Sequence, residues 1–103
     1  MPIYKAISYL KNSAPLSKPQ ALAFINSLSP KVQTQVIAAI YIGRDHLYAD
    51  KWNQDIMLST DYIDHIPQQN FAQIVHEKNS ALITYLQSIE RCAKNEGFDL
   101  NNL

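Results

Sequence analysis

The stretch V-I-A-A-I-Y-I, from Val36 to Ile42, decides the fold. None of its seven residues carries a charge or an amide. At about 100° per residue, their side chains point to every side of a helix. A helix that is apolar all round is buried in the middle of a domain. Pro30 and Gly43 bracket the run as helix start and stop. The stretch therefore predicts a buried central helix over about residues 30–42.

Composition places the remaining elements in the same structural class. A chain of 103 residues suits one domain, and we expect a single helical domain over residues 1–103. Two glycines leave no glycine-rich phosphate-binding loop and few tight hairpin turns. No segment alternates apolar and polar residues as a half-buried strand does. We expect an all-α, compact orthogonal bundle of about five to six helices around the central helix.

Targeting and redox signals are sparse. No apolar run approaches the roughly 20 residues that span a bilayer. The first residues, Met1–Lys5, lack the basic and apolar regions of a signal peptide. Cys92 is the only cysteine, which excludes an internal disulfide and a multi-cysteine zinc site. These features predict a cytoplasmic protein with no cofactor and no membrane contact.

The sequence predicts two helices before the central helix. An apolar stripe predicts a first helix over about residues 2–11. Ser17 and Gln20 form a capping box that opens a second helix, which ends near residue 27. Ser29 then caps the central helix, with proline at its first position. The inward side of the second helix is expected to carry Leu22, Ile25 and Leu28, with Phe24 beside them.

Three further helical segments are expected after the central helix. Trp52 and several isoleucines at helical spacing predict a helix over about residues 48–65, with its aspartates in solvent. A short helical turn should carry Phe71. The last helix should end at Gly97 in a left-handed conformation, which leaves residues 99–103 as a frayed tail.

Four motifs follow one another along the chain: Ser29-Pro30, Ile40-Tyr41-Ile42-Gly43-Arg44-Asp45, Trp52, and Leu82-x-x-Tyr85-Leu86. In this order they resemble a family of small bacterial proteins known only as a domain of unknown function. The resemblance covers about residues 28–90 and leaves residues 1–27 as an addition or a divergent start. Asp45 stands where the family continues with a second glycine, which makes this corner less open. The resemblance implies a helical fold and assigns no activity.

The corner after the central helix combines residue types that dominate protein interfaces, Tyr, Trp and Arg. Arg44 could present its guanidinium to a carboxylate, a phosphate or a partner chain, or it could pair with an aspartate and fix the corner. The aromatic residues could instead fill the core with their polar tips in water. We expect a non-enzymatic interaction or regulatory module that binds another protein or itself, as a homodimer. Its contact residues would be Tyr41, Arg44, Asp45, Tyr48 and Trp52.

A small metal-binding protein or hydrolase is the first alternative. His46 with Asp50, and Asp61 with His65, have the i, i+4 spacing that places two side chains on one helix face. A zinc or iron site needs three or four ligands. The two pairs would meet only if the loop around His46 folds back over the helix end.

Weak nucleic-acid binding is the second alternative. Residues 1–44 contain five basic residues and no acid, whereas the whole chain has a formal charge of zero. This asymmetry could steer a partner, or it could neutralise itself when the segments pack. A dedicated nucleic-acid binder would show a basic excess. The residues of this alternative are Lys5, Lys11, Lys18 and Lys31.

Overall fold

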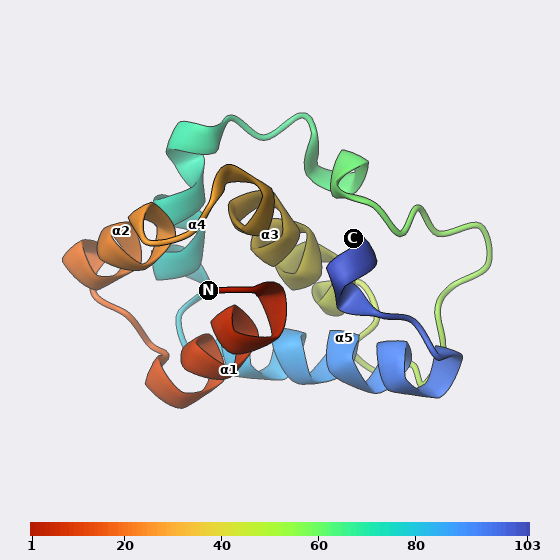
Figure 1. Ribbon diagram of the computed structural model, residues 1–103. Helices are drawn as coiled ribbons and strands as arrows, with labels where there is room; N and C mark the ends of the chain where they lie inside the picture. Colours follow the sequence, from red (N-terminus) through yellow and green to blue (C-terminus); the bar gives the residue numbers. More distant parts are fainter.

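The computed structural model describes residues 1–103 as five α-helices and three short 3-10 helices, with no strand (Figure 1). The α-helices are α1 (Ile3–Ser13), α2 (Lys18–Asn26), α3 (Pro30–Arg44), α4 (Phe71–Lys78) and α5 (Ala81–Glu96). The 3-10 helices are η1 (Thr60–Ile63), η2 (Gln68–Asn70) and η3 (Leu100–Asn102). This confirms the prediction of an all-α bundle. None of these helices combines the length and the hydrophobicity that spanning a bilayer requires.

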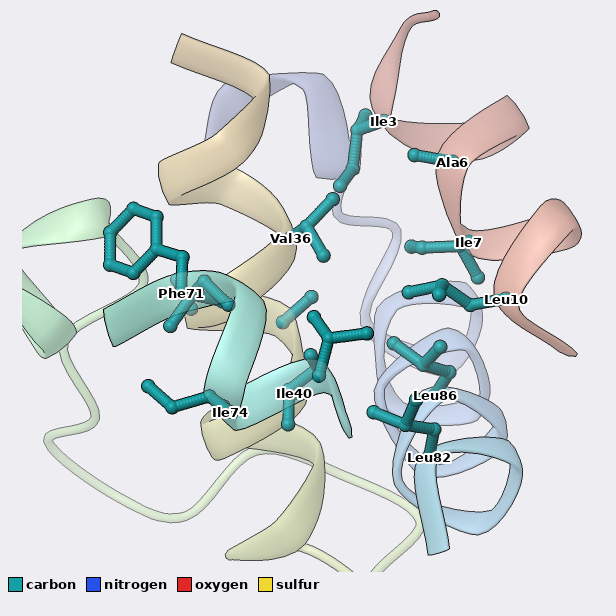
Figure 2. Close-up of a cluster of buried hydrophobic side chains, with 14 of the residues drawn as sticks. Ile3, Ala6, Ile7, Leu10, Val36, Ile40, Phe71, Ile74, Leu82 and Leu86 are labelled. Atoms are coloured by element: carbon teal, nitrogen blue, oxygen red, sulfur yellow. The ribbon is translucent and has the colours of Figure 1, made fainter. Parts of the chain in front are cut away.

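Helix α3 is the centre of the fold, as its apolar sequence predicts. Its residues from Val36 to Ile40 and Ile42 are fully buried. The most extensive contact in the molecule joins α3 to α5, and α1, α4 and η1 also pack on α3. Figure 2 shows Val36 and Ile40 between side chains of α1, α4 and α5. The buried central helix is therefore confirmed.

The predicted helix starts are present in the structure. In the capping box, the Gln20 amide donates to Ser17 Oγ at 3.2 Å and the Ser17 amide donates to Gln20 Oε1 at 2.9 Å. Ser29 caps α3 by accepting from the Val32 amide at 3.3 Å. Leu22 is not part of the inward side of α2, because its side chain is 53% exposed. Helix α2 packs chiefly on α4, and it turns Ala21, Phe24 and Ile25 inward.

Gly43 does not end the central helix. Helix α3 continues to Arg44, and Asp45 is its C-cap. A Cβ atom at position 43 would lie 2.0 Å from the carbonyl oxygen of Tyr85 in α5. Since no side chain fits there, the glycine allows the backbones of α3 and α5 to approach closely.

The predicted helix over residues 48–65 is wrong. Residues 45–59 form an irregular segment, here called the strap, which is followed by η1. Asp55 adopts a positive φ of 65°, which is incompatible with a helix interior. Aspartate and asparagine favour such irregular backbone because their side chains bond nearby main-chain groups. The strap still packs half-buried apolar side chains on the core, namely Trp52, Ile56 and Leu58.

The frayed tail expected at residues 99–103 is also wrong. Leu100 is fully buried, and Tyr4 Oη of α1 accepts from the Leu100 amide at 2.9 Å. Gln35 Nε2 in α3 donates to the main-chain oxygens of Asn101 at 3.1 Å and Leu103 at 3.3 Å. Because α1 shares the main hydrophobic cluster with α3 and α5, both ends of the described chain pack on one core.

Candidate functional site

Two cations lie over one aromatic ring at the end of α3. The guanidinium carbon of Arg44 is 4.6 Å from the centre of the Tyr41 ring. Lys78, the last residue of α4, places its Nζ atom 5.0 Å from the same centre. Cations at this distance are attracted by the negative face of the ring. Two helices that are distant in sequence therefore bring positive charge to the half-buried Tyr41.

Asp45 connects this corner to η1. One carboxylate oxygen lies 3.4 Å from Arg44 Nε, and the other accepts a short hydrogen bond from the Tyr62 hydroxyl. Burial, followed by the bond to Asp45, raises the pKa of Tyr62 to about 12. Arg44 is held through one nitrogen only, and its side chain is 40% exposed. Most of its guanidinium donors therefore remain available to a ligand.

A shallow hollow of about 340 Å³ adjoins the ring of Tyr41. Its apolar lining comes from Ile66 and Pro67, which precede η2, and from Ile74 of α4. Polar side chains of His65, Asn70, Gln73 and Glu77 also line it. We call Tyr41, Arg44, Lys78 and the apolar lining of this hollow the Tyr41 surface.

The other two predicted contact residues have different environments. Tyr48 lies in the turn after α3 and is fully exposed. Trp52 is half-buried against the core, where its ring meets His46 at 5.5 Å and Phe98 at 6.0 Å, edge to face. Its indole N–H is buried without a partner. Trp52 therefore has a packing role, whereas Tyr41, Arg44 and Asp45 come together as predicted.

The predicted metal ligands are not brought together. His46 is buried, with Nδ1 2.7 Å from the Ile42 oxygen and Nε2 2.9 Å from the Asn53 amide nitrogen. Nδ1 therefore donates to the Ile42 oxygen, and Nε2 accepts from the Asn53 amide. Neither ring nitrogen is free to bind a metal. His65 is exposed, 4.0 Å from Asp64. No group of three or more His, Cys, Asp or Glu residues is placed to hold a metal ion. The prediction of a metal site formed by His46, Asp50, Asp61 and His65 is therefore wrong.

The lysines of the nucleic-acid alternative do not form one row. Lys11 pairs with Glu90 of α5 at 2.5 Å, which supports neutralisation within the fold. Lys5, Lys18 and Lys31 are exposed on three different helices, α1, α2 and α3. A basic stripe along a single element, which is typical of nucleic-acid binders, is therefore not formed by these residues.

A row of polar side chains on α5 holds the strap, a role that the sequence alone does not predict. Arg91 donates to the oxygens of Ala49 at 2.9 Å, Leu47 at 3.1 Å and His46 at 3.3 Å. Ser88 Oγ lies 2.8 Å from the oxygens of Gly43 and His46. The row consists of Ser88, Arg91, Cys92 and Asn95. Their i, i+3, i+4, i+7 spacing is the one signal that marks a common face.

Cys92 within this row is a buried structural thiol. Its Sγ atom lies 3.5 Å from the Ala49 oxygen. Burial raises the pKa of the thiol. A raised pKa leaves less thiolate, which is the reactive form.

No protein-family model matches the chain, and no curated protein or solved structure shows significant similarity to it. The resemblance to the bacterial family of unknown function stays a prediction. The case for a function therefore depends on the geometry of the Tyr41 surface.

Proposed function

We propose that this protein is a non-enzymatic interaction module and that it binds another protein through the Tyr41 surface. The observation that carries the proposal is the convergence of Arg44 and Lys78 on the ring of Tyr41, beside a hollow lined by polar side chains and by Ile66, Pro67 and Ile74. Tyrosine and arginine are enriched among the residues that contribute most to protein binding. Protein interfaces combine apolar and polar contacts, and this surface offers both.

Preorganisation supports the same proposal. The Arg44 side chain is already stacked on Tyr41 and is in contact with Asp45, so binding would restrict it less than a free arginine. Tyr41 is fixed by α3, and Ile74 is fixed by α4. Tyr48, four residues after Arg44 and fully exposed, would extend the contact. Trp52 is left out because it packs on the core.

Self-association is one form of the proposal, since symmetric homodimers are common. We also place the protein in the cytoplasm, where a reducing environment suits its one buried thiol. Sedimentation over a range of protein concentrations would separate a homodimer from binding to a different protein.

A photo-crosslinking amino acid at position 48 tests the proposal in the native cell. Position 22 is the matched control, because Leu22 is exposed on α2. We expect a defined crosslinked partner, or a crosslinked dimer, from position 48 and not from position 22. Arg44→Ala in the same chain should abolish the product without changing the melting temperature. Equal products from both positions, or a product that survives Arg44→Ala, would overturn the proposal.

A further inference from the structure

We infer that the strap is a pH-sensitive switch, which is closed while His46 is neutral and opens when His46 takes up a proton. Figure 1 shows residues 45–59 as an irregular loop at the edge of the helices. The inference does not depend on the proposed function. It assigns a regulatory role to a buried histidine that the Tyr41 surface does not use.

His46 joins the middle of the strap to the end of α3 only in its neutral form. Its side chain is buried, and both ring nitrogens bond to the main chain. Nδ1 donates to the Ile42 oxygen at 2.7 Å, and Nε2 accepts from the Asn53 amide at 2.9 Å. A neutral imidazole has one donor and one acceptor, whereas the protonated ring has two donors. Protonation therefore turns the N–H of Nε2 against the N–H of Asn53 and breaks this bond.

The surroundings of His46 do not stabilise a positive charge on its ring. The charged residues next to it are Arg44, Asp45, Asp50 and Lys51 of the adjoining chain and Arg91 of α5. Asp45 and Asp50 keep their negative charges, but neither bonds to the ring, since main-chain atoms occupy both of its nitrogens. Arg91 Nη2 lies 3.3 Å from the His46 oxygen, so a cation already faces the residue. Burial of a further charge there without a bonded counter-ion is costly.

The other two histidines can be protonated without loss of a bond. His65 is exposed, and its Nδ1 lies 4.0 Å from Asp64 Oδ1, where a positive charge is favourable. His76 is half-buried, and its Nδ1 donates to the Leu16 oxygen at 2.9 Å, which leaves Nε2 to take up a proton. His46 is therefore the histidine that couples protonation to a change in structure.

The closed strap carries two costs that opening removes. The indole N–H of Trp52 is buried without a partner, whereas water would supply one. Asp55 has a φ of 65°, a left-handed conformation that is strained for a residue with a side chain. Because these costs offset part of the stabilisation by Arg91 and by the apolar contacts, loss of one further bond favours local opening.

The expected pH dependence follows from the two states of the strap. A histidine in water takes up a proton near pH 6.5. The closed strap excludes this proton and the open strap accepts it, so acid favours the open form. Below about pH 6.5, the equilibrium constant for opening should rise about tenfold for each unit of pH. Opening would also displace Tyr48, which the strap carries.

Amide hydrogen exchange of the full chain, measured by nuclear magnetic resonance, tests the inference. Observed rates are divided by the intrinsic rates at each pH to give the protection of each amide. We expect the protection of the Asn53 amide to fall about tenfold between pH 6 and pH 5, while protection in α1 stays constant. His46→Gln should show equal protection at the two pH values, because glutamine does not take up a proton. His65→Gln is the matched control and should behave like wild type.

Fluorescence provides a second measurement, which also covers a variant whose strap is open at every pH. Trp52 is the only tryptophan, so its emission reports on the strap. Between pH 7 and pH 4.5, emission of wild type and of His65→Gln should move to longer wavelength as the indole reaches water. Far-ultraviolet circular dichroism should stay constant because the helices remain folded. Emission of His46→Gln should not change with pH.

Three results would overturn the inference. Constant protection of Asn53 in wild type would show that acid does not open the strap. A fall of equal size in His46→Gln would assign the pH dependence to a different group. A parallel loss of protection in α1 would show that acid unfolds the whole domain rather than the strap.

Discussion

Helix α5 holds α3 and the strap by opposite means. Against α3 it presents chiefly apolar side chains, with a single hydrogen bond from Ser88 to the Gly43 oxygen, and the two backbones approach closely at Gly43. Against the strap it presents hydrogen-bond donors, of which Arg91 alone reaches three main-chain oxygens. A helix satisfies its own main-chain groups, whereas an irregular segment must find partners elsewhere. Helix α5 therefore has an apolar face that suits the helix α3 and a hydrogen-bonding face that suits the irregular strap.

The two attachments should also fail differently. The α3–α5 contact is part of the main core, so damage to it lowers the stability of the whole domain. The strap is attached through a few polar groups and three half-buried apolar side chains, so loss of one polar contact favours local opening. The distinction matters for function because the strap begins at Asp45, beside the Tyr41 surface, and carries Tyr48.

The largest expected effect comes from Gly43→Ala. The added Cβ would meet the Tyr85 oxygen at 2.0 Å, so α3 and α5 must move apart. We expect a loss of about 3 kcal/mol in the free energy of unfolding, at the upper end of overpacking effects. Urea denaturation measures it. Gly97→Ala is the control, because its φ of +66° strains the backbone but no atom lies within 4 Å, and it should cost about 1 kcal/mol. Equal losses in the two variants would contradict the close approach.

His46→Leu should have the second largest effect. It removes the acceptor of the Asn53 amide and the donor to the Ile42 oxygen, and it leaves the amide of the strap without a partner. We expect a loss of about 2 kcal/mol. His76→Leu is the matched control, since His76 is half-buried and contacts one main-chain oxygen, that of Leu16, at 2.9 Å. A smaller loss for His46→Leu than for the control would show that His46 does not hold the strap.

Arg91→Met tests local opening directly. The methionine keeps part of the apolar stem but loses the donors to the oxygens of His46, Leu47 and Ala49. We expect a loss of about 1 kcal/mol and faster hydrogen exchange confined to the strap. Mass spectrometry of exchanged peptides from residues 45–59 and from α1 measures both regions. Acceleration of equal size in α1 would mean that the strap and the core open together.

The parts of the fold that the sequence predicts are those with local signals. Ser17 with Gln20, Ser29 with Pro30, and Gly97 mark helix ends by hydrogen bonding or backbone conformation within a few residues. The strap lacks such a signal. The helical spacing of its apolar residues also arises when an irregular segment packs one side on a core. Gly43 is ambiguous for a related reason, because only the contact with Tyr85 distinguishes a close approach from a helix stop.

The candidate site also has one part that the sequence predicts and another part that depends on how the helices pack. Tyr41, Arg44 and Asp45 are neighbours at a helix end, so their proximity follows from the sequence. Lys78 and Ile74 reach Tyr41 only because α4 packs beside α3, and no local pattern encodes that contact. His46 is a histidine with metal-compatible spacing, yet its burial and two main-chain partners give it a structural role.

Tyr62→Phe should have the smallest effect, and it tests whether η1, which follows the strap, is fastened to the start of the strap. The Tyr62 hydroxyl of η1 donates to Asp45, and its pKa is raised from 10.0 to about 12. As pH rises through this interval, the unfolded chain releases its proton before the folded chain does. The free energy of unfolding should therefore fall between pH 10 and 12. The variant lacks this contribution.

Urea denaturation of both proteins at pH 8 and pH 11 measures the difference. Wild type should lose more stability than Tyr62→Phe between the two pH values. Tyr4, whose pKa is also raised, is present in both proteins and cancels in the comparison. An equal loss in both would show that the bond between Tyr62 and Asp45 does not persist in solution. The strap would then be held by α5, His46 and its apolar contacts, and Asp45 would be free to take part in the Tyr41 surface.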